Sequence, residues 1–252
     1  MTTVNVKQAA NVLELLEFFA AHQRPASLAE IAKHFDWPRS STFNLLGTLA
    51  QHGYLYEPRP KAGYYPTPAW ASLINRIEQS QPMPKDMLAL LQQLVSDTGE
   101  TAVLAAVSGS DALFVETVES PHSVRYAAPV GKRVPLHTTA TGRTLLSQMR
   151  SDERAGVLRK ASFDQYTDTT LMSAEAVEAE IALSIKRGWF QGNAEFTQDL
   201  GGVAMPLALG ERRFAVLVAG PMYRVAHRIP DLAQTLRARL DVYVKTQGDI
   251  PG

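Results

Sequence analysis

The chain has 252 residues, of which 45% are hydrophobic and 20% charged, and its formal net charge is zero. This length suits two domains of ordinary size better than one. The absence of cysteine excludes disulfides, thiolate metal sites and a catalytic thiol. The sequence has no apolar run of about 18 residues and no leader-like start, so we expect a cytoplasmic protein without membrane contact.

Two helical patterns lie back to back between residues 27 and 55. Ser27 is followed three residues later by Glu30, a capping box that predicts a helix start. Apolar residues recur at helical spacing up to Phe35, and Pro38 stands where a second helix would begin. The exposed positions of that second helix carry short polar side chains, an arginine and an aromatic residue, which suit phosphates and base edges. A helical hairpin of an ordinary α domain gives the same pattern, so the pair alone leaves both interpretations open.

A short hairpin follows the helix pair and favours the DNA-binding interpretation. Residues 54–56 and 64–65 are strand-like and flank a turn that contains Arg59 and Lys61. An earlier apolar stripe from Val12 to Phe19 supplies a third helix, so residues 5–66 predict a winged helix-turn-helix. We expect DNA contacts from Ser27, Arg39, Ser40, Ser41, Thr42, Phe43, Asn44, Thr48, Arg59 and Lys61.

The charge of this region predicts binding in pairs. Residues 1–80 contain seven Lys or Arg and six acidic residues, so one copy alone should hold double-stranded DNA weakly. We therefore expect at least two copies on a palindromic site.

An amphipathic helix is predicted over residues 69–80, before Pro82 and Pro84. Its apolar stripe requires a partner, which is either its own domain or, as we favour, the same helix of a second subunit. The predicted division is a DNA-binding domain over residues 1–67, a linker helix over 68–83 and a second domain over 84–252.

The pattern beyond residue 84 predicts an α+β domain on an antiparallel sheet. Helices are predicted over residues 86–95, 139–149, 153–159, 173–187 and 229–244, and strands over 101–107, 112–118, 124–127, 203–209 and 214–219. There is no P-loop and no GxGxxG motif, so we expect no nucleotide cofactor and no enzyme. His137 has no second histidine at ligand spacing and no catalytic partners, so we expect a structural residue and no metal.

Several segments stand in the same order as in a known family. They are Pro38-Arg39-Ser40-Ser41-Thr42, Gly99-Glu100-Thr101, Val134-Pro135-Leu136-His137, Ala140-Thr141-Gly142-Arg143, Gly188 with Glu195, and Gly220-Pro221. Together they resemble the isocitrate-lyase-regulator (IclR) family of bacterial transcription factors. The resemblance implies a winged helix-turn-helix, a linker helix, a GAF-like domain that binds a small organic acid, and a homodimer or homotetramer. Where the family commonly has a basic residue this chain has Asn44, an amide suited to reading adenine.

The same resemblance implies the residues of the effector pocket. They are Ser123, Arg125, Thr139, Ala140, Thr141, Asn193, Glu195, Gly202, Leu217 and Ala219. Alternation along a strand would place Ser123 and Arg125 on one face. A helix that starts at Thr139 offers free backbone N–H groups to a carboxylate. Family members that bind very small keto acids have polar side chains at the last three positions, so we expect a larger acid here, for instance an aromatic one.

Two classes of function follow from the sequence. The first, which we favour, is a transcriptional regulator whose operator binding is controlled by a small organic acid. The alternative is a small-molecule-binding protein or enzyme whose winged-helix domain contacts another protein. Retention of a palindromic DNA fragment distinguishes the two.

Overall fold

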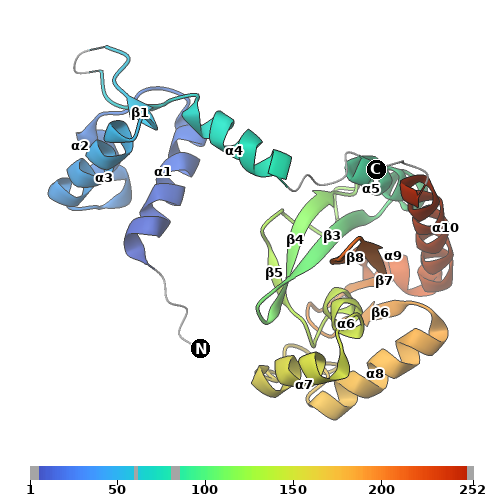
Figure 1. Ribbon diagram of the computed structural model, residues 1–252. Coiled ribbons are helices and arrows are strands. Elements are labelled where there is room, and N and C mark those ends of the chain that lie inside the picture. Colours follow the sequence, from blue (N-terminus) through green and yellow to red (C-terminus); the bar gives the residue numbers. More distant parts are fainter. Residues whose placement is uncertain (1–5, 60–61, 81–85, 249–252) are drawn as a thin grey trace. The chain divides into compact units, whose positions relative to one another are not determined.

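The computed structural model describes residues 6–59, 62–80 and 86–248. Contacts divide the chain into two compact units, residues 1–83 and 84–252, which are described separately below (Figure 1). Among the described residues, no helix is both long enough and apolar enough to cross a membrane.

The first unit is a helical bundle with a short hairpin. Its elements are α1 (Lys7–His22), α2 (Leu28–Phe35), α3 (Arg39–Gln51), β1 (Leu55–Tyr56), β2 (Tyr65–Pro66) and α4 (Ala69–Ser80). The three helices before the hairpin enclose Leu15, Phe19, Ile31 and Leu46, each at most 3% exposed. The two strands pair antiparallel, and Ala26 bridges Tyr64 to extend the hairpin toward α2. The predicted winged helix-turn-helix is therefore confirmed.

The capping box at the start of α2 forms as the sequence predicts. The Ser27 hydroxyl accepts from the Glu30 backbone N–H at 3.2 Å, and the Glu30 carboxylate accepts from the Ser27 N–H at 2.8 Å. Hydrogen bonds to the Glu30 carboxylate, first from the Ser27 backbone N–H and then from the Ser27 and Arg24 side chains, lower the pKa of Glu30 to about 2. The carboxylate stays charged at the positive end of the helix, which stabilises the first turn of α2.

Helix α4 spans the residues that the sequence predicts. Its Trp70 packs on Tyr54, with ring centroids 4.4 Å apart, and the indole Nε1 donates to the Tyr54 carbonyl at 3.0 Å. Ile74 and Ile77 on the same helix are 57% and 60% exposed. Pro82 and Pro84, which are predicted to follow the helix, lie outside the described residues.

The second unit is an α+β domain on a six-stranded antiparallel sheet, as predicted. The sheet contains β3 (Thr101–Ser108), β4 (Asp111–Val118), β5 (Arg133–Pro135), β6 (Phe190–Asn193), β7 (Leu200–Leu209) and β8 (Arg212–Pro221), in the order β5-β4-β3-β8-β7-β6. Its helices are α5 (Asp86–Thr98), α6 (Ala140–Ser147), α7 (Ser151–Lys160), α8 (Ala174–Arg187), α9 (Met222–Val225), the 3₁₀ turn η1 (Ala226–Arg228) and α10 (Ile229–Gly248).

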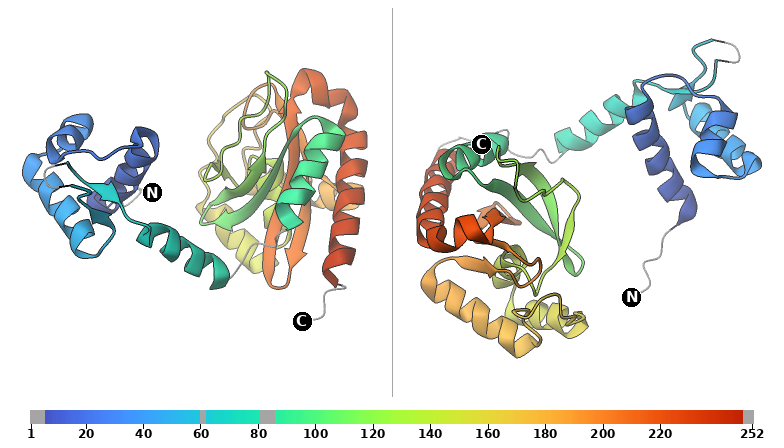
Figure 2. Two further views of the ribbon diagram at one scale, coloured as in Figure 1. Left: turned by 90° about the horizontal axis from the view of Figure 1, so that it is seen from above. Right: turned by 180° about the vertical axis from the view of Figure 1, so that it is seen from behind.

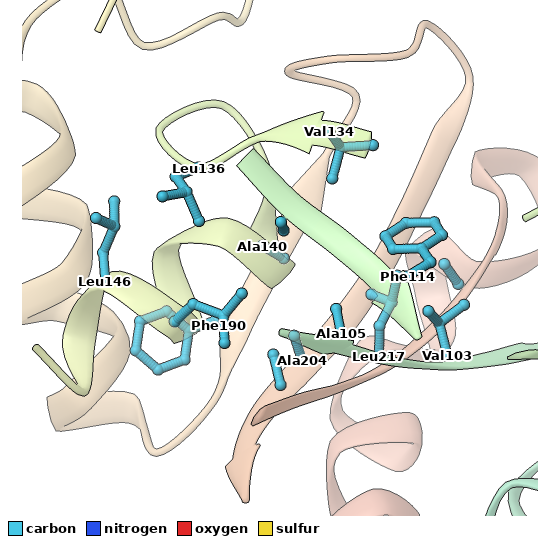
Figure 3. Packing of buried hydrophobic residues seen from close by; sticks show 14 of the residues in the cluster. Val103, Ala105, Phe114, Val134, Leu136, Ala140, Leu146, Phe190, Ala204 and Leu217 are labelled. Atoms are coloured by element: carbon cyan, nitrogen blue, oxygen red, sulfur yellow. The ribbon is translucent and has the colours of Figure 1, made fainter. Parts of the chain in front are cut away.

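The helices lie on both faces of this sheet. α5 and α10 pack together over one face, and α6 packs on the other with α8 beside it (Figure 2). Alternate residues of each strand enter the two layers. Figure 3 shows the layer under α6, where Val103, Phe114 and Leu217 of the sheet meet Leu136 and Ala140.

The strand predicted over residues 124–127 is wrong. Those residues have no strand partner, and the third strand beside β4 is β5, further along the chain. The misleading signal is a short real alternation, since Tyr126 and Ala128 are buried while Arg125 and Ala127 are exposed. The Tyr126 carbonyl accepts from the Thr101 hydroxyl at 2.8 Å. A side-chain hydroxyl thus provides the hydrogen bond that a neighbouring strand would provide in a sheet. The short strand β6 was not predicted.

Gly142 determines how closely α6 approaches the segment before it. A Cβ atom at this position would lie 2.2 Å from the Leu136 carbonyl oxygen and 2.4 Å from the Leu136 Cα. Those neighbours are backbone atoms of a fully packed core, so they cannot move aside as a flexible side chain would. The absence of a side chain therefore sets the position of the first turn of α6.

Replacing Gly142 by alanine should destabilise the fold by about 1–3 kcal/mol, because the methyl group overpacks the contact with Leu136. A methyl group on Gly156 in α7 would meet no atom within 4 Å beyond its own stretch of helix, so Gly156→Ala should raise stability by about 0.5–1 kcal/mol. Urea unfolding of both variants measures the difference. Equal effects would show that Gly142 is not constrained by close packing.

Candidate nucleic-acid interface and effector pocket

The exposed face of α3 presents a mixed polar and aromatic surface. Arg39, Ser40, Ser41 and Asn44 are exposed. Phe43 lies among them with 59% of its surface exposed, which is unusual for a phenylalanine. The Thr48 side chain lies on the same helix, and its hydroxyl donates to the Asn44 carbonyl at 2.8 Å. This face can reach both phosphates and base edges in a major groove.

Two predicted DNA-contacting residues have structural roles instead. Thr42 is 0% exposed and its hydroxyl donates to the Pro38 carbonyl at 3.1 Å, so its side chain does not lie on the exposed face. The expected contact from Thr42 is therefore wrong. Ser27 uses its hydroxyl in the capping box of α2. Arg59 is exposed in the hairpin connection, while Lys61 lies outside the described residues.

A cavity lies in the second unit between the start of α6 and the sheet. Its lining comes from strands β4 to β8, the first turn of α6 and the connections around them: Phe114, Tyr126, Val134, Thr138, Thr139, Ala140, Thr141, Gly192, Glu195, Phe196, Thr197, Leu200, Gly201, Gly202, Leu217 and Ala219. Seven of the ten residues predicted for the effector pocket are among them.

One end of this cavity is polar. Thr139 caps α6, and its hydroxyl accepts from the Gly142 N–H at 3.0 Å. The N–H groups of Ala140 and Thr141 belong to the first turn, where the helix itself supplies no acceptor. Thr138 belongs to the cavity lining, and its hydroxyl is buried without a hydrogen-bond partner among the described residues. Sequence reasoning missed Thr138. Together these donors and the helix dipole suit a carboxylate.

The rest of the cavity wall is apolar. Phe114 and Tyr126 meet edge to face with ring centroids 6.3 Å apart. Burial raises the pKa of Tyr126 to about 12, so its phenol is neutral at physiological pH. Leu217 and Ala219 of β8 and Gly202 of β7 add no polar side-chain group. The cavity thus combines one polar end with an aromatic and aliphatic body, the usual composition of a small-molecule site.

Three predicted pocket residues lie elsewhere. Ser123 and Arg125 belong to the irregular segment after β4, and neither lines the cavity. Arg125 is partly exposed and its Nε donates to the Glu119 carboxylate at 2.6 Å. The Asn193 side chain is exposed, although its backbone N–H donates to Glu195 Oε2 at 2.5 Å. The prediction that Arg125 faces the pocket fails because its neighbour Tyr126 occupies the inward position.

Arg143 is a buried cation that sequence reasoning did not assign to the site. It is 0% exposed, and its Nη2 donates to Glu195 Oε1 at 2.8 Å and to the Gln191 carbonyl at 2.8 Å. Its motif position in α6 was visible in the sequence, but its partner lies 52 residues further along the chain. Glu195 lines the cavity, so the ion pair stands directly behind the wall.

His137 occupies a structural position, and the described residues contain no cluster of three or more potential metal ligands. The imidazole is 4% exposed and meets the Phe163 ring edge to face at 4.9 Å. Burial lowers the pKa of His137 below its ordinary value of 6.5, with a smaller opposing effect from Asp164. The side chain is therefore neutral at physiological pH.

An exposed helix-turn-helix face and a cavity with the composition of a small-molecule site define a one-component regulator, a protein that joins a DNA-binding domain to an effector domain. Family models agree: the IclR helix-turn-helix domain matches residues 8–59, and the C-terminal domain of bacterial IclR transcriptional regulators matches residues 77–241. The chain belongs to the IclR family, whose curated members are named as transcriptional regulators and repressors.

Curated relatives match along most of the chain. The acetate operon repressor of Salmonella typhimurium is 29% identical over 247 residues, covering 95% of this chain and 90% of that protein. The probable transcriptional regulator SauR of Cupriavidus necator is 29% identical over 242 residues, covering 94% of this chain and 96% of that protein.

Solved structures share the fold at lower identity. The Thermotoga maritima IclR structure has a TM-score of 0.73 at 20% identity and covers 97% of this chain and all of that one. An IclR homologue from Microbacterium hydrocarbonoxydans, solved with 4-hydroxybenzoate, has a TM-score of 0.62 at 19% identity, covering 93% of this chain and 99% of that one.

The neutral, buried His137 predicts a pH dependence of stability. Its pKa is lower in the folded state, so below about pH 6.5 the unfolded chain binds more protons and stability falls. The contribution is at most about 1.4 kcal/mol per pH unit. Urea unfolding between pH 5 and 8 should show a shallower decline in His137→Gln than in the unsubstituted protein. Parallel curves for the two proteins would contradict this assignment.

Proposed function

We propose that the protein binds a palindromic operator as a homodimer or homotetramer, and that an organic acid in the α6 cavity controls this binding. The main support for the proposal is the start of α6. Its first backbone N–H groups have no acceptor within the helix, and its first turn lines a cavity that is otherwise largely apolar. A DNA-binding regulator of this kind acts in the bacterial cytoplasm, where the DNA is. We also propose that the chain divides into a DNA-binding domain over residues 1–67, a linker helix over 68–83 and an effector-binding domain over 84–252.

The carboxylate of the acid would accept from the Ala140 and Thr141 N–H groups and from the Thr138 hydroxyl. Carboxylates bind well at such a helix start because the free N–H groups and the dipole both favour negative charge. The body of the acid would lie against Phe114, Tyr126 and Leu217.

Cavity size bears on which acid fits. The cavity measures about 50 Å³, enough for roughly four water-sized groups. An aromatic acid is larger, so it requires one wall to move outward. The aromatic lining favours such an acid once the wall moves, and 4-hydroxybenzoate and pyruvate are suitable large and small probes.

If the protein is a regulator, it should bind the DNA upstream of its own gene more tightly than random DNA. Because Asn44 is exposed on α3, Asn44→Ala should lose about 1–3 kcal/mol of base discrimination for each subunit bound. Gln92→Ala, an exposed change on α5 in the second unit, is the control. Fluorescence anisotropy at physiological salt measures both. A protein that binds this DNA no better than random DNA would refute the regulator proposal.

If an organic acid binds in the cavity, it should stabilise the folded protein. A ligand at one hundred times its dissociation constant adds about 2.7 kcal/mol to the free energy of unfolding. Thr138→Val keeps the shape of the side chain and removes the unpaired hydroxyl, so it should weaken binding of 4-hydroxybenzoate about tenfold. Thermal-shift titration measures the affinity, with Arg125→Ala as a control outside the cavity. Weakening by Arg125→Ala instead would place the carboxylate elsewhere.

A further inference from the structure

The loop between β6 and β7, residues 194–199, forms one wall of the cavity through Glu195, Phe196 and Thr197. The residues at its two ends, Ala194 and Asp199, have φ angles of 60° and 63°. Residues with a Cβ atom disfavour this left-handed conformation. Such a conformation persists only where surrounding contacts hold it, so other parts of the domain must hold this loop in place.

Both oxygens of the Glu195 carboxylate help to hold the loop. Oε1 accepts from Arg143 Nη2 at 2.8 Å, which joins the loop to α6. Oε2 accepts from the Asn193 N–H at 2.5 Å, which closes the loop on the end of β6. The two bonds occupy one lone pair on each oxygen, so the carboxylate joins α6, β6 and the loop at a single point.

The burial of Arg143 makes this ion pair difficult to open. The Arg143 side chain is 0% exposed and that of Glu195 is 11% exposed. Arg143 Nε and Nη1 are buried without a hydrogen-bond partner in the part of the chain that the structure describes. Removing Glu195 would therefore leave a buried cation with still fewer partners, which is strongly unfavourable.

A second contact fastens the loop from its outer side. The Thr170 hydroxyl donates to the Glu195 carbonyl at 2.7 Å and accepts from the Thr167 N–H at 2.8 Å. The Tyr166 ring meets Phe196 edge to face at 4.8 Å. Thr170 does not line the cavity. A change at Thr170 can thus reach the cavity only through the loop.

We infer that Glu195 is a positioning residue, which together with Arg143 and Thr170 holds residues 194–199 in place as one wall of the cavity. The loop is the wall that would move outward to admit an aromatic acid, a consequence that rests on the proposed function. The fastening itself is a property of the protein alone and is tested without any ligand.

The test is chymotrypsin cleavage after Phe196 in the full-length protein, followed by mass spectrometry. Glu195→Gln and Thr170→Val should each speed cleavage at Phe196 about tenfold, because the loop opens more often. Glu119→Gln, which alters the exposed ion pair with Arg125, is the matched control and should leave the rate unchanged. Cleavage after Phe114, 1% exposed in β4, reports global unfolding.

Unchanged cleavage at Phe196 in both variants would overturn the inference. Equal acceleration at Phe196 and Phe114 would also overturn it, because the substitutions would then destabilise the whole unit. A second measurement uses the ligand. Thr170→Val should alter the affinity for 4-hydroxybenzoate at least fivefold, although Thr170 lies outside the cavity. Unchanged affinity in an opened variant would contradict the positioning role. If no acid binds the unsubstituted protein, the proposed function fails while the cleavage result stands independently.

Discussion

The close approach of α6 to the backbone of Leu136 is the constraint on which the second unit depends. Because Gly142 has no side chain, the first turn of the helix lies directly against the preceding segment. That position places Ala140 and Thr141, at the start of the helix, in the wall of the cavity. It also places the next residue, Arg143, against β6 and the loop that follows. One missing side chain thus positions both the polar end of the cavity and the cation behind its wall.

A second, partly buried ion pair holds the segment that carries Tyr126, another residue of the cavity wall. Glu100 is 0% exposed and accepts from Arg224 Nε at 2.5 Å and Nη2 at 2.8 Å. Arg224 Nη2 also donates to the carbonyl of Val124 in the irregular segment that carries Tyr126. Gly220 makes room, since a Cβ there would lie 2.1 Å from Glu100 Oε2. Buried pairs add little net stability compared with an apolar core, so their value here is in fixing the position of irregular segments.

The sequence predicted the elements whose signals are local. The start of α2 follows from Ser27 and Glu30, and the end of α8 follows from Gly188, which has a φ of 91°. Both signals act within one helical turn, so they need no knowledge of the fold. The strands β5 and β6 are too short to show a period, and Gly192 weakens the pattern further. Their pairing depends on partners distant in the chain.

The candidate site divides in the same way. The start of α6 was predictable because a capping threonine marks a helix N-terminus locally. The choice between Arg125 and Arg143 was not, since the two residues look alike in sequence and differ in what surrounds them. Arg125 has an exposed acid nearby, while Arg143 finds Glu195 only after β6 and α6 have packed together. Burial decides which arginine acts near the cavity, and burial is a property of the assembled sheet and helices.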